Sequence, residues 1–212
     1  MRGFLKLARI YGATLAGGDM SEAPKSVLAD VMVVGSVPKR GAVLRSGAKP
    51  GDLIYVTGSL GGSRATLQSL FDGGKVSAKA PEHRRHFYPE PRVAVGAFLQ
   101  QRKLATAIID LSDGLSTDLA HICEESGVGA VINEKALPVA AGSSLDFALH
   151  GGEDYELLFT AGPRRNLPAS IAGVKVTEIG KVTREKKMLI ATSDGKKKRL
   201  VPKGWEHFST AR

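Results

Sequence analysis

Residues 108–127 read IIDLSDGLSTDLAHICEESG, and this stretch decides the fold that we expect for the chain. Its apolar start, with Ala107 before it, predicts a short buried strand. The sequence then turns polar, and apolar residues recur at Leu115, Leu119 and Ile122, the spacing of a helix that faces a core. Gly127 follows as a typical residue for a helix C-terminus. The stretch therefore predicts a strand, a polar turn and a helix.

The polar turn of this stretch carries Asp110, Ser112 and Asp113. Where a strand ends and a helix begins, backbone N–H groups and the helix dipole favour phosphate, and nearby carboxylates can hold the metal that accompanies it. Ser112 or Asp113 could instead cap the helix, which is a commoner role. The stretch alone leaves both interpretations open.

Two other turns combine acidic residues with glycine, Gly17-Gly18-Asp19 and Gly151-Gly152-Glu153-Asp154. Aspartates on loops beside glycine are a usual way to hold Mg²⁺, which prefers oxygen ligands, although a single such spot is more often an ordinary turn. Other chemistries fit less well. The sequence has no GxxxxGK[ST] phosphate loop and no GxSxG nucleophile motif, and its five histidines lack the spacing of zinc ligands.

Composition indicates a globular protein with a sizeable core: the chain has 212 residues, 42% of them hydrophobic and 24% charged. The single cysteine, Cys123, excludes an internal disulfide and suits a reducing cytoplasm. No stretch approaches the roughly 20 apolar residues of a membrane span, so we expect no membrane partner.

The net charge of +9 is compatible with a nucleic-acid partner, with an anionic nucleotide as substrate, or with an organism whose proteins are generally basic. The densest run, Lys196 to Arg199, follows Ser193-Asp194-Gly195 between two apolar stretches and predicts a solvated hairpin turn. No RNA-binding aromatic motif accompanies it. We therefore expect no nucleic-acid partner.

Strand and helix patterns alternate along the chain, which predicts an α/β or α+β fold. The expected elements are an amphipathic helix ended by Gly12, a strand over 27–37, a boundary at 38–41, a strand over 53–57, a glycine turn at 58–62 into a helix through Leu70, a polar surface segment over 72–91, a helix over 92–102, the central strand–turn–helix, and a strand entered by 149–159.

Five motifs follow one another in the order seen in thiamine-monophosphate kinases, of the aminoimidazole ribonucleotide synthetase-like superfamily. They are GGDMS (17–21), LRSGAKPGDLIYVTG (44–58), IDLSDGLSTDL (109–119), GGEDYELLF (151–159) and GWEHF (204–208). The chain resembles this family over essentially its whole length. The resemblance implies transfer of the γ-phosphate of ATP, with Mg²⁺, onto the phosphate of thiamine phosphate, which gives thiamine diphosphate.

The resemblance also implies roles for single residues. Gly18, Asp19, Arg45 and Ser112 match nucleotide contacts, and Asp19, Asp110 and Asp113 match magnesium ligands. Glu153, with Asp154 beside it, and Trp205 match the substrate side. Several Mg²⁺ ions and an arginine would offset the repulsion of two phosphates, and carboxylates with an aromatic face suit a cationic thiazolium.

The family begins with a long segment that carries a GDDA-type magnesium motif, and Met1 resembles a position inside the helix before GGD. The resemblance thus implies that residues 1–40 are a remnant of an N-terminal ATP- and Mg²⁺-binding domain and that 41–212 form the C-terminal domain. We expect a 212-residue chain of this kind to have little or no kinase activity and to lose the family's homodimer. The alternatives are another ATP-dependent synthetase of the superfamily and a non-catalytic basic binding protein.

Overall fold

The computed structural model describes residues 2–22 and 24–205, and the chain divides into two units, Met1–Arg40 and Gly41–Arg212. Of the closing GWEHF motif, residues 206–208 lie outside the described residues. No helix in the described part is long and apolar enough to cross a membrane.

The first unit contains one helix, α1 (Arg2–Ile10), which confirms the amphipathic helix expected before Gly12. The strand predicted over 27–37 is wrong, because these residues form no strand and take part in none of the strand pairs of the described chain. Their apolar side chains face solvent, with Val27 97% and Met32 89% exposed. A β-propensity pattern becomes a strand only where a neighbouring strand pairs with its backbone.

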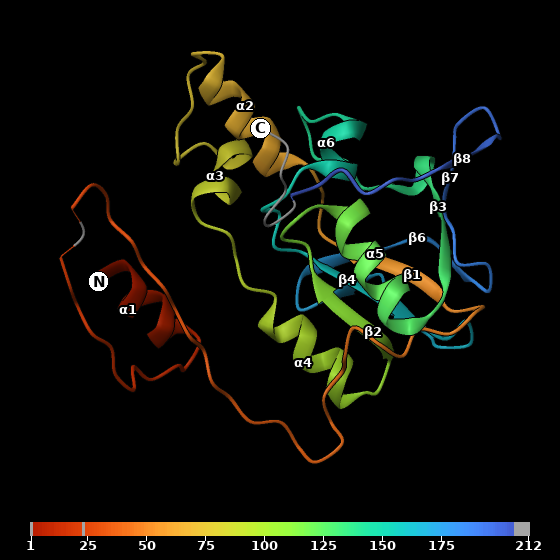
Figure 1. Cartoon of the computed structure of the whole chain (residues 1–212), viewed down its shortest axis with the longest axis horizontal. Helices are drawn as coiled ribbons and strands as arrows, with labels where there is room; N and C mark the ends of the chain where they lie inside the picture. Colours follow the sequence, from red (N-terminus) through yellow and green to blue (C-terminus); the bar gives the residue numbers. More distant parts are fainter. Residues whose placement is uncertain (1, 23, 206–212) are drawn as a thin grey trace. The chain divides into compact units, whose positions relative to one another are not determined.

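The second unit is built on an eight-stranded mixed sheet in the order β2-β4-β1-β6-β3-β7-β8, with β5 paired to β6 off this path (Figure 1). All neighbours are antiparallel except β3 and β7. The strands are β1 (Leu53–Thr57), β2 (Ala105–Asp110), β3 (Gly129–Asn133), β4 (Leu157–Ala161), β5 (Ser170–Ile171), β6 (Val174–Thr183), β7 (Met188–Ala191) and β8 (Lys197–Arg199).

Helices cover both faces of this sheet. Side chains alternate between the two faces along each strand, so each face presents apolar residues for a helix to pack against. On β1, Ile54 and Val56 join the cluster that contains α5, whereas Tyr55 joins a second cluster with Leu99 of α4. Figure 1 shows α5 lying across the sheet. The helices of this unit are α2 (Gly62–Phe71), α3 (Pro81–Phe87), α4 (Val93–Gln101), α5 (Leu115–Ser126) and α6 (Leu145–His150), with a 3₁₀ turn at Glu134–Ala136.

The central stretch folds as the sequence predicts, with β2, a turn and α5 in succession. Gly127 ends α5 in the left-handed conformation (φ 65°), and its N–H donates to the carbonyl groups of Cys123 and Glu124. The predicted strand over 53–57 and the helices after 62 and 92 are also confirmed. The mixed α/β architecture is the predicted fold class.

The polar segment 72–91 lies on the surface as expected, with every residue exposed or half-buried, and it contains the short helix α3, which Pro81 starts in its first turn. One prediction needs correction in detail. The basic run near residue 196 was expected to be the turn of a hairpin; Lys197–Arg199 instead form the edge strand β8, and the turn lies before them at 192–196. Lysine on an edge strand discourages further strand pairing.

Candidate active site

The turn between β2 and α5 is held by the side chain of Asp118. One carboxylate oxygen of Asp118 accepts the backbone N–H groups of Asp113 and Gly114, both at 3.1 Å. Asp118 is 1% exposed, and this burial raises its pKa to about 7. Neither Ser112 nor Asp113 caps the helix, because Gly114 occupies the N-cap position and no side chain there accepts a capping hydrogen bond. Asp118 instead holds the turn from inside the helix, and the N–H groups of Asp113 and Gly114 are already bonded.

Asp113 and Asp118 lie beside His121 on the next turn of α5, and one ligand atom from each of the three lies within 4.8 Å of the others. Carboxylate oxygens are the donors that Mg²⁺ takes, so the two aspartates fit this ion. Asp110, an expected ligand, is exposed at the end of β2 but is close enough for its charge to raise the pKa values of Asp118 and Tyr155.

The predicted nucleotide contacts divide between the two units, and within the second unit Arg45 and Ser112 lie near opposite ends of α5. Gly18 and Asp19 belong to the first unit and are exposed, and the Asp19 carboxylate accepts the N–H of Met20 at 2.8 Å. Arg45 is exposed beside the far end of α5, where its carbonyl accepts the hydroxyl of Ser126. That end lies about 18 Å along the helix from Asp113.

The loop after α6 places alternate residues on opposite sides. Glu153 and Tyr155 line a pocket, whereas the Asp154 carboxylate accepts the N–H groups of Gly61 (2.7 Å) and Ser63 (3.4 Å) at the start of α2. Burial raises the pKa of Asp154 to about 6, even though these N–H groups favour its charged form. Of the two acidic residues expected on the substrate side, Glu153 is the one at the pocket.

Glu156 is the fully buried member of this loop, with 0% of its surface exposed. Arg92 donates to both of its carboxylate oxygens, at 2.7 and 2.6 Å. Thr57 donates its hydroxyl at 2.6 Å and Arg85 one guanidinium N–H at 2.9 Å. This network ties the start of β4 to β1, to α3 and to the residue just before α4.

The C-terminal segment closes the same region. The backbone N–H groups of Lys203, Gly204 and Trp205 donate to the Ser116 hydroxyl (3.3 Å), the Thr117 hydroxyl (3.1 Å) and the Asp113 carbonyl (3.0 Å). A side chain on Gly204 would run into that same carbonyl, so glycine permits the close approach. The Trp205 ring remains 66% exposed at the pocket.

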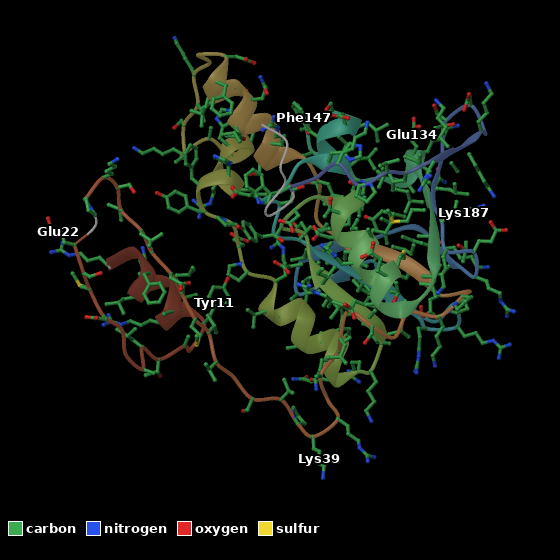
Figure 2. All side chains as sticks on the ribbon, in the orientation of Figure 1. Tyr11, Glu22, Lys39, Glu134, Phe147 and Lys187 are labelled. Carbon is green, nitrogen blue, oxygen red and sulfur yellow. The ribbon has the colours of Figure 1, made fainter. Side chains whose placement is uncertain are left out.

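These segments enclose a pocket of about 910 Å³ with walls of mixed charge. Arg64 lies over the ring of Phe147, 5.8 Å from its centroid. Figure 2 labels Phe147, which belongs to α6. Burial lowers the pKa of His150, whose Nδ1 pairs with the hydroxyl of Ser116 at 2.8 Å. The lining residues are Ser63, Arg64, Leu67, His86, Ser112, Asp113, Asp146, Phe147, His150, Gly151, Gly152, Glu153, Tyr155, Lys203, Gly204 and Trp205.

The pocket thus unites Ser112, Asp113, Glu153 and Trp205 from three separate motifs. Sequence reasoning missed Asp118, Tyr155 and the buried Glu156 network. Asp118 had a local signal, because an acidic residue in the first turn of a helix after glycine is a typical capping partner. Glu156 had none, since its partner Arg92 lies 64 residues away in the chain.

Comparisons with known proteins show the family of the chain. Residues 49–191 match the family described as AIR synthase related protein, C-terminal domain. Thiamine-monophosphate kinase from Salmonella typhimurium is 40% identical over 219 residues, which cover 96% of this chain and 66% of that enzyme. The Bacillus subtilis enzyme of the same name is 34% identical, over 97% of this chain and 68% of its own length.

Among solved structures, AaThiL complexed with AMPPCP and TMP superimposes with a TM-score of 0.66 and 36% identity, over 78% of this chain and 54% of that one. The chain spans just under two thirds of the Salmonella relative that it matches. The motif order, the fold and these similarities lead to one assignment: the chain belongs to the thiamine-monophosphate kinase family, and residues 49–191 are its AIR synthase related C-terminal domain.

Proposed function

We propose that this chain takes part in the ATP-dependent phosphorylation of thiamine monophosphate to thiamine diphosphate, and that residues 41–212 supply the pocket for the acceptor. Family membership supports the reaction. One observation carries the assignment of the pocket: Asp113, Glu153 and Trp205, distant in the sequence, line a single cavity.

The pocket suits an acceptor that carries both charges. Thiamine monophosphate joins a cationic thiazolium to an anionic phosphate. Glu153 and the exposed face of Trp205 offer the carboxylate and aromatic surface that attract an organic cation. Arg64 and Lys203 on other parts of the wall offer positive charge to a phosphate.

Magnesium is part of the proposal, held on this side by the carboxylates of Asp113 and Asp118. When bound, the ion would neutralise charge on the phosphates as they approach each other. The Asp118 carboxylate also accepts the backbone N–H of Asp113. This hydrogen bond fixes the backbone that carries the Asp113 carboxylate before any ion binds.

Asp113→Asn tests the metal role. We expect the variant to lose most Mg²⁺ binding measured by calorimetry in the presence of AMPPCP, about tenfold or more in affinity. Its unfolding midpoint should stay unchanged, because the Asp113 side chain does not cap α5 and Asp118 holds the turn. Asp194→Asn is the control for the same change of side chain, since Asp194 lies in the exposed β7–β8 turn and is not among the residues that line the pocket. Equal Mg²⁺ affinity in Asp113→Asn and wild type would contradict the role.

A ligand panel tests the function itself. Thiamine monophosphate should bind, whereas aminoimidazole precursors and RNA should not; binding of either of these would favour the superfamily synthetase or the basic binding protein. That the 212-residue polypeptide alone turns over at near background stays a prediction, as does the loss of the family's homodimer. Formation of thiamine diphosphate near one per second, an ordinary kinase rate, would contradict the first.

A further inference from the structure

The loop that forms one wall of the pocket has an unusual backbone. Glu153 (φ 62°) and Tyr155 (φ 49°) both adopt the left-handed conformation that side chains other than glycine seldom take. Both side chains line the pocket. Such conformations persist only where the surroundings enforce them, and they gather at ligand-binding sites.

The residue that follows each of them enforces this conformation. Asp154 binds the two N–H groups at the start of α2, and Glu156 is fixed by Arg92 and Thr57. The backbone adds three bonds, Glu153 N–H to Ser112, Tyr155 N–H to Leu111 and Leu111 N–H to Glu156, at 2.8, 2.9 and 2.8 Å. The strained residues therefore alternate with their anchors.

We propose that Asp154 and Glu156 are positioning residues, which hold Glu153 and Tyr155 against the pocket, and that Tyr155 is a second contact of this loop with the cationic ring of the acceptor. The contact by Tyr155 rests on the proposed function; the positioning does not. Released from Asp154, the two strained residues relax toward negative φ, and this rotation carries their side chains away from the pocket.

A purely structural role for Asp154 makes a different prediction. As the cap of α2 alone, its loss would lower the stability of the whole unit but leave the loop and the pocket unchanged in the folded protein. Two measurements therefore distinguish the positioning role from a purely structural one: hydrogen exchange of the loop amides and the affinity for the ligand. Both are made well below the unfolding temperature.

The first experiment needs no ligand. Hydrogen–deuterium exchange of the peptide that spans 151–156 is compared in wild type, Asp154→Ala, Asp154→Asn and the control Asp194→Asn. We expect exchange about tenfold faster or more in Asp154→Ala, confined to this peptide and the start of α2. Asp154→Asn keeps one carbonyl acceptor for Gly61 and should recover most of the protection. Unchanged exchange of the peptide, or a uniform increase across the unit, overturns the positioning role.

The second experiment follows the binding of thiamine monophosphate through the fluorescence of Trp205, the single tryptophan of the chain, which lies at the pocket. Asp154→Ala should bind about tenfold more weakly, as should Tyr155→Ala, whereas Tyr155→Phe keeps the aromatic face and should bind as wild type does. Wild-type affinity in Tyr155→Ala overturns the contact. If wild type itself does not bind, the proposed function and the Tyr155 contact both fail, and the exchange result alone still decides the positioning.

Discussion

Removing the buried carboxylate of Glu156 should be among the most damaging single changes in this protein. The Glu156 side chain is fully buried and the Arg92 side chain is only 8% exposed, so neither charge can turn to water. Glu156→Leu leaves the Arg92 guanidinium without its bidentate partner. Breaking a buried pair from one side costs about 3–5 kcal/mol, because the remaining charge stays desolvated.

The other partners change this figure little. Arg92 keeps its ion pair with Glu90, but that pair is long, at 3.6 Å, and the Glu90 side chain is 67% exposed, so it compensates only weakly. Arg85 is 48% exposed and can be solvated after the substitution, so its ion pair contributes about 1 kcal/mol or less. Thr57 keeps one bond, since its hydroxyl also accepts the N–H of Leu157 at 2.8 Å. We therefore expect a loss of about 3–5 kcal/mol in the free energy of unfolding, a large part of the 5–15 kcal/mol of a typical domain.

A double-mutant cycle separates the pair from its surroundings. Glu156→Leu, Arg92→Met and the double variant are unfolded in urea, with circular dichroism and Trp205 fluorescence as probes of the second unit. The double variant should be more stable than the sum of the single losses predicts, with a coupling of about 2–3 kcal/mol, because it removes both members of the buried pair and leaves neither charge without the other. A loss below about 1 kcal/mol in Glu156→Leu, or additive losses, would refute the reasoning.

Two further predictions concern stability. Burial raises the pKa of Asp154 from 3.8 to about 6, so the folded chain holds this proton more tightly than the unfolded chain. As the pH rises from 4 to 6, the proton is lost and the free energy of unfolding falls by up to about 3 kcal/mol. Asp154→Asn should remove that pH dependence in urea unfolding curves; parallel profiles would contradict it. Gly129→Ala would bring a Cβ to 2.5 Å from the Lys187 carbonyl oxygen, so thermal unfolding should show a loss of about 1–3 kcal/mol, whereas the control Gly96→Ala, with space for a Cβ, should be neutral or stabilising.

The sequence by itself determined the local elements and the residues that meet in the pocket. The strand–turn–helix of 105–126 and the left-handed Gly127 depend on neighbours within one or two helical turns, and periodicity records such neighbours directly. The motif order likewise pointed to Asp113, Glu153 and Trp205, which the fold brings to one cavity.

Only the tertiary structure decided which of the adjacent acidic residues face that cavity. Asp118, rather than Asp113, accepts the N–H groups of the turn before α5, and Asp154 turns to α2 while Glu153 faces the pocket. It also left residues 27–37 without a strand partner. The reason is physical: a carboxylate is fixed by the nearest N–H groups and cations in space, and Glu156 finds its own in Arg92, 64 residues away in sequence.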